Sequence, residues 1–91
     1  MKRAANASEK RHLGRVAALP CSVCDAPGPS AVHHPRFCVG MSERASHWLA
    51  IALCYECHQG QRGIHGDRSA WRLRKMDEPD ALAVTLRRLS A

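Results

Sequence analysis

The strongest constraint on the fold is a set of four cysteines arranged as two C-x-x-C pairs. Cys21 and Cys24 form the first pair, and Cys54 and Cys57 form the second. Each spacing lets two thiolates hold one zinc ion from a tight turn, and two pairs complete a tetrahedral site. Four unrelated buried cysteines or a redox pair are the alternatives, but redox chemistry needs only one pair. Because a closed Cys₄ site leaves no position for substrate, the pattern predicts a structural zinc, not a catalytic one.

A metal that holds the fold together also suits the length of the chain. With 91 residues, the chain is expected to form a single domain with a thin core. The apolar fraction of 45% is ordinary for a globular protein and argues against disorder of the whole chain. Cys38 lies outside both pairs. We expect it to be a small apolar filler, with a metal ligand or a reactive thiol as the alternatives.

The charge balance favours a partner made of phosphates. The chain has 14 Lys and Arg against 8 Asp and Glu, a formal net charge of +6, which suits DNA without proving it. No apolar run is long enough to span a membrane, and the start "MKRAANASEKRH" lacks the apolar centre of a signal peptide. We therefore expect a soluble cytoplasmic protein without a membrane partner, whose cysteines stay reduced.

The sequence predicts three helices and two strands. A first helix is expected over 8–19, with Ser8 as its N-cap and Pro20 as its stop. Short strands are expected over 30–34 and 48–54. Further helices are expected over 67–76, capped by Asp67, and over 79–89, where Leu82, Leu86 and Leu89 share one face.

Several histidines surround the two cysteine pairs. His33 and His34 are adjacent on the first expected strand, where alternation points their side chains to opposite faces. His58 follows Cys57 directly, and His65 comes soon after it. A zinc ion joining the two pairs would bring the end of the first strand near His58. The four histidines are thus expected to cluster, although each alone would more often be a surface or satisfied core residue.

These motifs together resemble a known family. The "HH" pair followed by "LCYECH" is similar to the HNH (His-Me finger) endonuclease pattern. More narrowly, "HLGRVAALPCSVC", "HHPR", "GMSERASHWLAIALCYECHQG" and "GIHGDR" resemble the phage recombination-enhancement family of RecA-dependent nucleases, over about residues 10–68. The resemblance implies a small α+β, zinc-stabilised ββα-metal domain with flanking helices. Residues 1–91 would be a single domain, with an N-terminal helix in 1–19, the zinc-bound core in 20–66 and C-terminal helices in 67–91.

The resemblance also implies roles for individual residues. His34 matches the general base, and His33 and His58 match ligands of a catalytic divalent metal, which would be Mg²⁺, Mn²⁺ or Zn²⁺. His65 matches a further catalytic-site histidine of the narrower family. The middle Asn of HNH is missing, since the chain's only Asn is Asn6, and His47 is a possible substitute as a metal ligand. The chemistry agrees, because an imidazole with a pKa near 6.5 can accept a proton at cellular pH.

Arginines near these motifs are candidates for binding DNA phosphates through their planar guanidinium groups. The candidates are Arg36, Arg44, Arg62, Arg68 and Arg72. Arg87 and Arg88 are instead expected on a solvated helix face. The resulting hypothesis is a phage-derived endonuclease that hydrolyses DNA phosphodiester bonds, is linked to recombination and has a RecA filament as a possible partner. The alternatives are a non-catalytic, zinc-ribbon-like DNA-binding or adaptor module, and a thiol redox protein.

Overall fold

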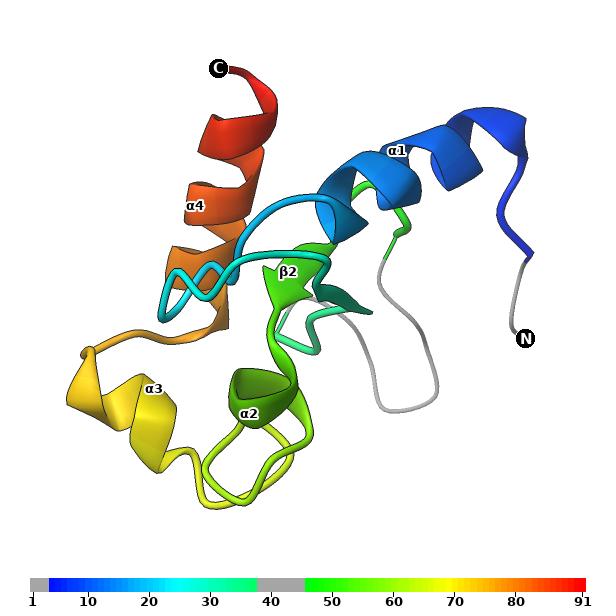
Figure 1. The fold of residues 1–91 in the computed structure, drawn as a ribbon. Helices are drawn as coiled ribbons and strands as arrows, with labels where there is room; N and C mark the ends of the chain where they lie inside the picture. Colours follow the sequence, from blue (N-terminus) through cyan, green and yellow to red (C-terminus); the bar gives the residue numbers. More distant parts are fainter. Residues whose placement is uncertain (1–3, 38–45) are drawn as a thin grey trace.

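The computed structural model describes residues 4–37 and 46–91 and shows a small α+β fold (Figure 1). The elements follow the order α1 (Ala7–Ala17), β1 (Ala31–His33), β2 (Ile51–Leu53), α2 (Tyr55–His58), α3 (Ser69–Leu73) and α4 (Glu78–Leu89). The expected elements are therefore present, with the strands shorter than predicted. The four-residue helix α2 was not expected from the residue pattern. Within the described residues, every helix is too short or too polar to cross a lipid bilayer.

Helix α1 begins at Ala7, and its N-cap lies two residues before the expected one. Asn6 is the N-cap: its side-chain oxygen accepts a hydrogen bond from the Glu9 backbone N–H at 2.8 Å, and the Glu9 carboxylate accepts one from the Asn6 N–H at 2.9 Å. This reciprocal pair satisfies two of the helix's unpaired donors. Ser8 lies inside the helix and accepts a hydrogen bond from Arg11. The prediction of Ser8 as the cap is wrong, because Asn6 has the matching Glu three residues later.

The sheet consists of two antiparallel strands, and all three residues of β2 are buried. Ala31 pairs with Leu53, Val32 with Ala52, and His33 with Ile51. Ile51 and Leu53 face a core shared with the cysteine pairs, α3 and α4. Ala50 and Ala52 face the opposite way, toward Val16 of α1 and Leu89 of α4. The strand is buried on both sides because alternate side chains enter two different clusters.

The C-terminal helices also differ from expectation at their ends. Asp67 accepts a hydrogen bond from the Ser69 N–H at 2.8 Å, but the N-cap position of α3 is Arg68. The expected Asp67 cap is therefore wrong by one residue. Helix α4 begins at Glu78, with a hydrogen bond from the Asp77 N–H to the Asp80 carboxylate at 2.8 Å. Its buried face is formed by Ala81, Leu82 and Thr85, whereas the expected stripe residue Leu86 is 38% exposed.

Candidate metal centres

The four cysteines of the two C-x-x-C pairs meet in one cluster. Cys21 and Cys24 lie in the turn after α1, and Cys54 and Cys57 lie at the start of α2. One sulfur from each residue lies within 4.8 Å of all the others. In each pair a backbone N–H, from Val23 and from Cys57, donates to the first sulfur at 3.4 Å. The two turns thus present their sulfurs to the same point from segments 30 residues apart.

Burial and mutual proximity make it costly to ionise all four thiols of this cluster. Burial raises the pKa of the Cys24 and Cys57 thiols, and the neighbouring sulfurs add to the effect. Burial also acts to raise the pKa of Cys21, but hydrogen bonds from backbone N–H groups outweigh it and leave that pKa below its ordinary value. Four sulfurs this close repel one another once ionised, and a divalent ion would remove that repulsion. The cluster could therefore hold a structural metal such as zinc, with all four positions filled by protein.

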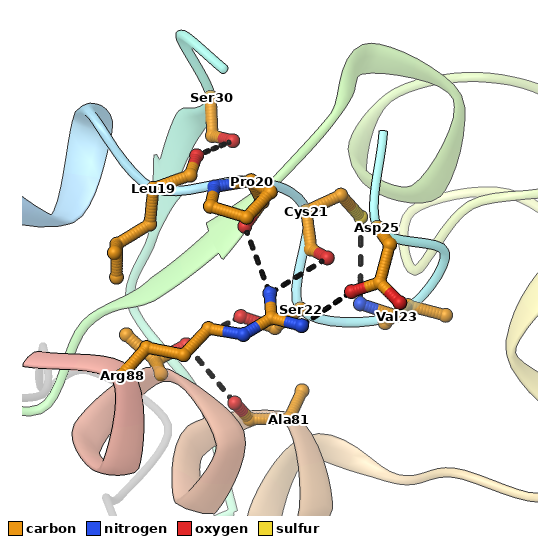
Figure 2. Close-up of polar contacts among 10 residues, drawn as sticks. Leu19, Pro20, Cys21, Ser22, Val23, Asp25, Ser30, Ala81 and Arg88 are labelled. Carbon is orange, nitrogen blue, oxygen red and sulfur yellow. Dashed lines mark hydrogen bonds and ion pairs between the residues drawn. The ribbon is translucent and has the colours of Figure 1, made fainter. Parts of the chain in front are cut away.

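Helix α4 is fastened to the first cysteine turn by Arg88 (Figure 2). Its guanidinium group donates to the carbonyl oxygens of Pro20 at 3.4 Å and Cys21 at 3.3 Å, and forms an ion pair with Asp25. The Ser22 and Thr85 hydroxyls form a second link between the same elements at 2.7 Å. The expectation that Arg88 lies on a solvated helix face is therefore wrong, while its neighbour Arg87 is exposed.

A second cluster is formed by three histidines from different elements. His33 ends β1, His58 ends α2, and His65 lies in the loop that follows α2. Their ring centroids are 5.1 Å (His33 to His58), 5.3 Å (His33 to His65) and 4.9 Å (His58 to His65) apart. One nitrogen of each lies within 4.8 Å of the others, so the three could act as ligands of a single metal ion. We call these three residues the histidine cluster.

The loop after α2 places His65 against His58 through its backbone. The His65 N–H donates to the His58 carbonyl at 3.1 Å, and the preceding Ile64 N–H donates to the Cys57 carbonyl at 2.9 Å. The loop packs closely against the backbone that precedes it. A Cβ at Gly63 would lie 2.6 Å from the Glu56 carbonyl oxygen, and one at Gly66 would lie 2.2 Å from the Gln61 carbonyl oxygen. Glycine is required because only it lets backbone segments approach this closely. The second cysteine turn and the histidine cluster therefore share a scaffold.

The three histidines of the cluster differ in burial, and burial affects the pKa of His58. His33 is 4% exposed, His58 is half-buried and His65 is exposed. Burial, together with the positive charges that His33 and His65 can carry, lowers the pKa of His58 to about 4. At neutral pH His58 is therefore uncharged and has a nitrogen lone pair for a metal.

Glu78 of α4 is a functional candidate that the sequence analysis missed. Its Oε2 lies 2.5 Å from His33 Nε2, and its Oε1 accepts a hydrogen bond from the Arg36 backbone N–H at 3.2 Å. Both side chains of the His33–Glu78 pair are largely buried, with 5% and 14% exposed. No local pattern identifies this contact, because 45 residues separate its two partners.

His34 lies apart from the histidine cluster and pairs with His47. The two rings are 5.1 Å apart, and His34 Nε2 lies 3.1 Å from His47 Nδ1. Among the described residues, the second group able to hold a metal contains His33, His58 and His65, and His47 is not part of it. The structure therefore does not support His47 as the substitute for the missing Asn ligand. The adjacent His33 and His34 thus take different partners, but His34 lies one residue beyond the end of β1, so strand alternation does not account for the difference.

A surface hollow of about 410 Å³ joins these groups. It is lined by Val32, His33, His34, Arg36, His58, Gln59 and His65. All four histidines named as catalytic candidates thus border one space, with an arginine beside them. The hollow therefore places three histidines that could hold a metal beside a fourth imidazole and a guanidinium group.

The other arginine candidates that the structure describes do not line the hollow. The Arg62 side chain donates to Ser69 at 3.0 Å, and Arg68 donates to the Ile64 carbonyl at 3.3 Å. The Arg72 and Arg62 charges help to lower the pKa of Asp67, after its hydrogen bonds with Ser69, so both lie near that residue. Arg36 alone of the described candidates lines the hollow. Arg44 and Cys38 lie outside the described residues.

Comparison of the chain with protein-family models, curated proteins and solved structures gave no match. The site must therefore be interpreted from its own geometry.

Proposed function

We propose that this protein is a metal-dependent endonuclease of the HNH type that hydrolyses DNA phosphodiester bonds. The observation that carries the proposal is the hollow in which the histidine cluster, His34 and Arg36 meet. A phosphodiesterase needs a cation site, a proton acceptor and a group that binds phosphate, and these side chains can supply all three. The net charge of +6 supports a polyanionic substrate.

The order of elements around the hollow supports the HNH assignment. Two antiparallel strands, β1 and β2, are followed directly by helix α2. His33 ends the first strand and His58 ends the helix, which are the places where the resemblance puts metal ligands. The same short helix carries half of the cysteine cluster, since Cys54 is its N-cap and Cys57 directly precedes His58. We therefore propose a ββα-metal unit held in shape by zinc.

In this proposal the adjacent histidines divide the chemistry between them. A divalent cation held by the histidine cluster would offset charge on the scissile phosphate and the leaving oxygen. His34 would accept the proton of the attacking water. When its Nε2–H donates to His47 Nδ1, the basic nitrogen of His34 is Nδ1, and His47 fixes the ring orientation. We therefore assign His47 an orienting role rather than a metal-binding one.

The donor set narrows the choice of metal. Imidazole nitrogen suits Zn²⁺ and similar transition ions, whereas Mg²⁺ prefers oxygen ligands and retains its waters. Three histidines within reach of one ion thus favour Zn²⁺ over Mg²⁺, with Mn²⁺ between them in preference.

The test is nicking of supercoiled plasmid DNA by the purified protein with Zn²⁺, Mn²⁺ or Mg²⁺, with and without a RecA filament. His34→Ala should lower the cleavage rate by about 10²- to 10⁴-fold, which is the usual contribution of a positioned base. His12→Gln is the matched control, because His12 lies on α1 against Trp48 and outside the hollow. His34→Ala cutting as fast as the wild-type protein would contradict the role of this residue.

A non-catalytic zinc-ribbon-like DNA-binding module is the second candidate. The His33–Glu78 pair favours it, because a carboxylate partner satisfies a buried histidine without any metal. This candidate predicts that the wild-type protein binds DNA but does not cut it with any of the three metals, with or without RecA.

A further inference from the structure

The position of Glu78 is fixed by contacts of helix α4 that do not involve the histidine cluster. Glu78 is the first residue of α4, next to Asp77, whose N–H is bound by the Asp80 carboxylate. The other end of α4 is fastened to the first cysteine turn by Arg88. Glu78 therefore projects from a helix that is fixed at both ends.

Both oxygens of the Glu78 carboxylate are used on the segment that carries the adjacent histidines. Oε2 contacts His33 Nε2 at 2.5 Å and Oε1 accepts the Arg36 N–H at 3.2 Å. One side chain thus restrains both the ring of His33 and the backbone three residues later. This two-point contact fixes the ring of His33 relative to the hollow that Arg36 also lines.

The contact also selects which nitrogen of His33 can bind a metal. An ionised carboxylate only accepts hydrogen bonds, so the proton of the contact lies on His33 Nε2. In the neutral ring the lone pair is then on Nδ1. A carboxylate in this position makes the imidazole a stronger ligand and adds negative charge beside the three imidazoles.

We propose that Glu78 is a positioning residue that orients His33 and sets the affinity of the histidine cluster for a divalent transition metal. The inference rests on the metal-binding part of the proposed function and extends it to a residue outside the histidine motif. It does not require that the protein cleave DNA. The chemistry that recognises the metal is three imidazoles with one supporting carboxylate.

The protein is loaded with zinc and then mildly chelated, so that zinc remains only in the cysteine cluster. Co²⁺ binding is then followed by the visible absorption of Co²⁺ and by competition with a chelator. Glu78→Ala should weaken Co²⁺ binding by about 10- to 100-fold, the usual effect of losing such a supporting group. Glu78→Gln should lose less affinity and keep the wild-type spectrum, because its amide oxygen can still accept from His33. Asp67→Asn is the matched control: it removes an exposed acidic charge outside α4 and keeps an oxygen that can accept the Ser69 N–H.

Each outcome decides the proposal. Equal Co²⁺ affinity in Glu78→Ala and Asp67→Asn would overturn it, as would a wild-type protein that binds no Co²⁺ outside the cysteine cluster. A changed spectrum in Glu78→Gln would make Glu78 a direct ligand and would also overturn the positioning role. Failure of the nuclease proposal would give a different result. Glu78→Ala would still have a lower affinity for Co²⁺ than the wild-type protein, but neither the wild-type protein nor any variant would cut DNA.

Discussion

Replacing Cys57 by Ser should unfold the protein, because it removes one of the four sulfurs that we propose bind zinc at the edge of the main core. Cys57 is 1% exposed and packs in the cluster that contains Ile51, Leu53 and Trp71. The Trp71 indole N–H donates to the Cys57 carbonyl at 2.8 Å. The substitution thus combines a lost ligand with a new hydroxyl in an apolar environment.

The expected magnitude follows from comparing zinc binding with total stability. A domain of 91 residues is stable by about 5–14 kcal/mol, at about 0.05–0.15 kcal/mol per residue. Binding of a structural zinc supplies about 10–16 kcal/mol at neutral pH. An unsatisfied buried hydroxyl costs a further 1–3 kcal/mol or so. Because the zinc contribution is comparable to or larger than the whole stability, a variant that no longer binds zinc should be largely unfolded.

Tryptophan fluorescence gives a direct assay, since Trp71 is buried at 2% exposure beside Cys57. The chain has two tryptophans, so a Trp48→Phe background makes Trp71 the sole reporter. In this background Cys57→Ser, or removal of zinc by a strong chelator, should shift the emission to that of a solvent-exposed indole. Cys38→Ser is the matched control and should keep one zinc per chain. A zinc-free protein with the wild-type emission and melting temperature would refute the reasoning.

Three further predictions follow from particular contacts. Arg88→Ala should lower the free energy of unfolding in urea by about 1–2 kcal/mol, because two hydrogen bonds to carbonyl oxygens are lost and the ion pair with the exposed Asp25 adds little. Arg87→Ala, at an exposed position, should change it by less than about 0.5 kcal/mol, and equal effects would contradict the role of Arg88. Gly66→Ala should lower the free energy of unfolding by about 1–3 kcal/mol and weaken Co²⁺ binding, because its Cβ would lie 2.2 Å from the Gln61 carbonyl oxygen. Gly14→Ala is the control and should have neither effect, because its Cβ would have nothing within 4 Å. If Arg62 and Arg68 contact DNA phosphates, replacing both by Ala should flatten the log–log salt dependence of DNA binding by about 0.9 per lost contact, and an unchanged slope would place the DNA surface elsewhere.

The features that the sequence predicts well are those encoded by local spacing. The two C-x-x-C pairs predict the meeting of Cys21, Cys24, Cys54 and Cys57, because each spacing brings two sulfurs together and all four lie within 4.8 Å of one another. The start of α4 follows from Pro79, whose fixed φ suits the first turn of a helix. Such signals depend on a few neighbouring residues and can be read without knowing the fold.

The features that the sequence does not predict depend on contacts between distant segments. Glu78 contacts His33, and Arg88 contacts Pro20 and Cys21, across 45 and 67 or more residues. In isolation Glu78 is an ordinary acidic residue in the first turn of a helix, and Arg88 an ordinary basic one in the last turn. Both acquire their partners only when α4 packs against β2. The Asn6 cap, by contrast, could have been found from the Glu9 that completes its capping box.

The central claim is that the chain has two metal centres with different tasks, a closed cysteine cluster and an open histidine cluster. Native mass spectrometry of the purified protein, with Zn²⁺ added and then partly removed by mild chelation, counts the ions directly. We predict one zinc that stays bound after chelation and a second ion that binds reversibly. His58→Ala should lose the second ion and keep the first. A wild-type protein that never binds more than one ion, or a His58→Ala variant that still binds two, would contradict the account.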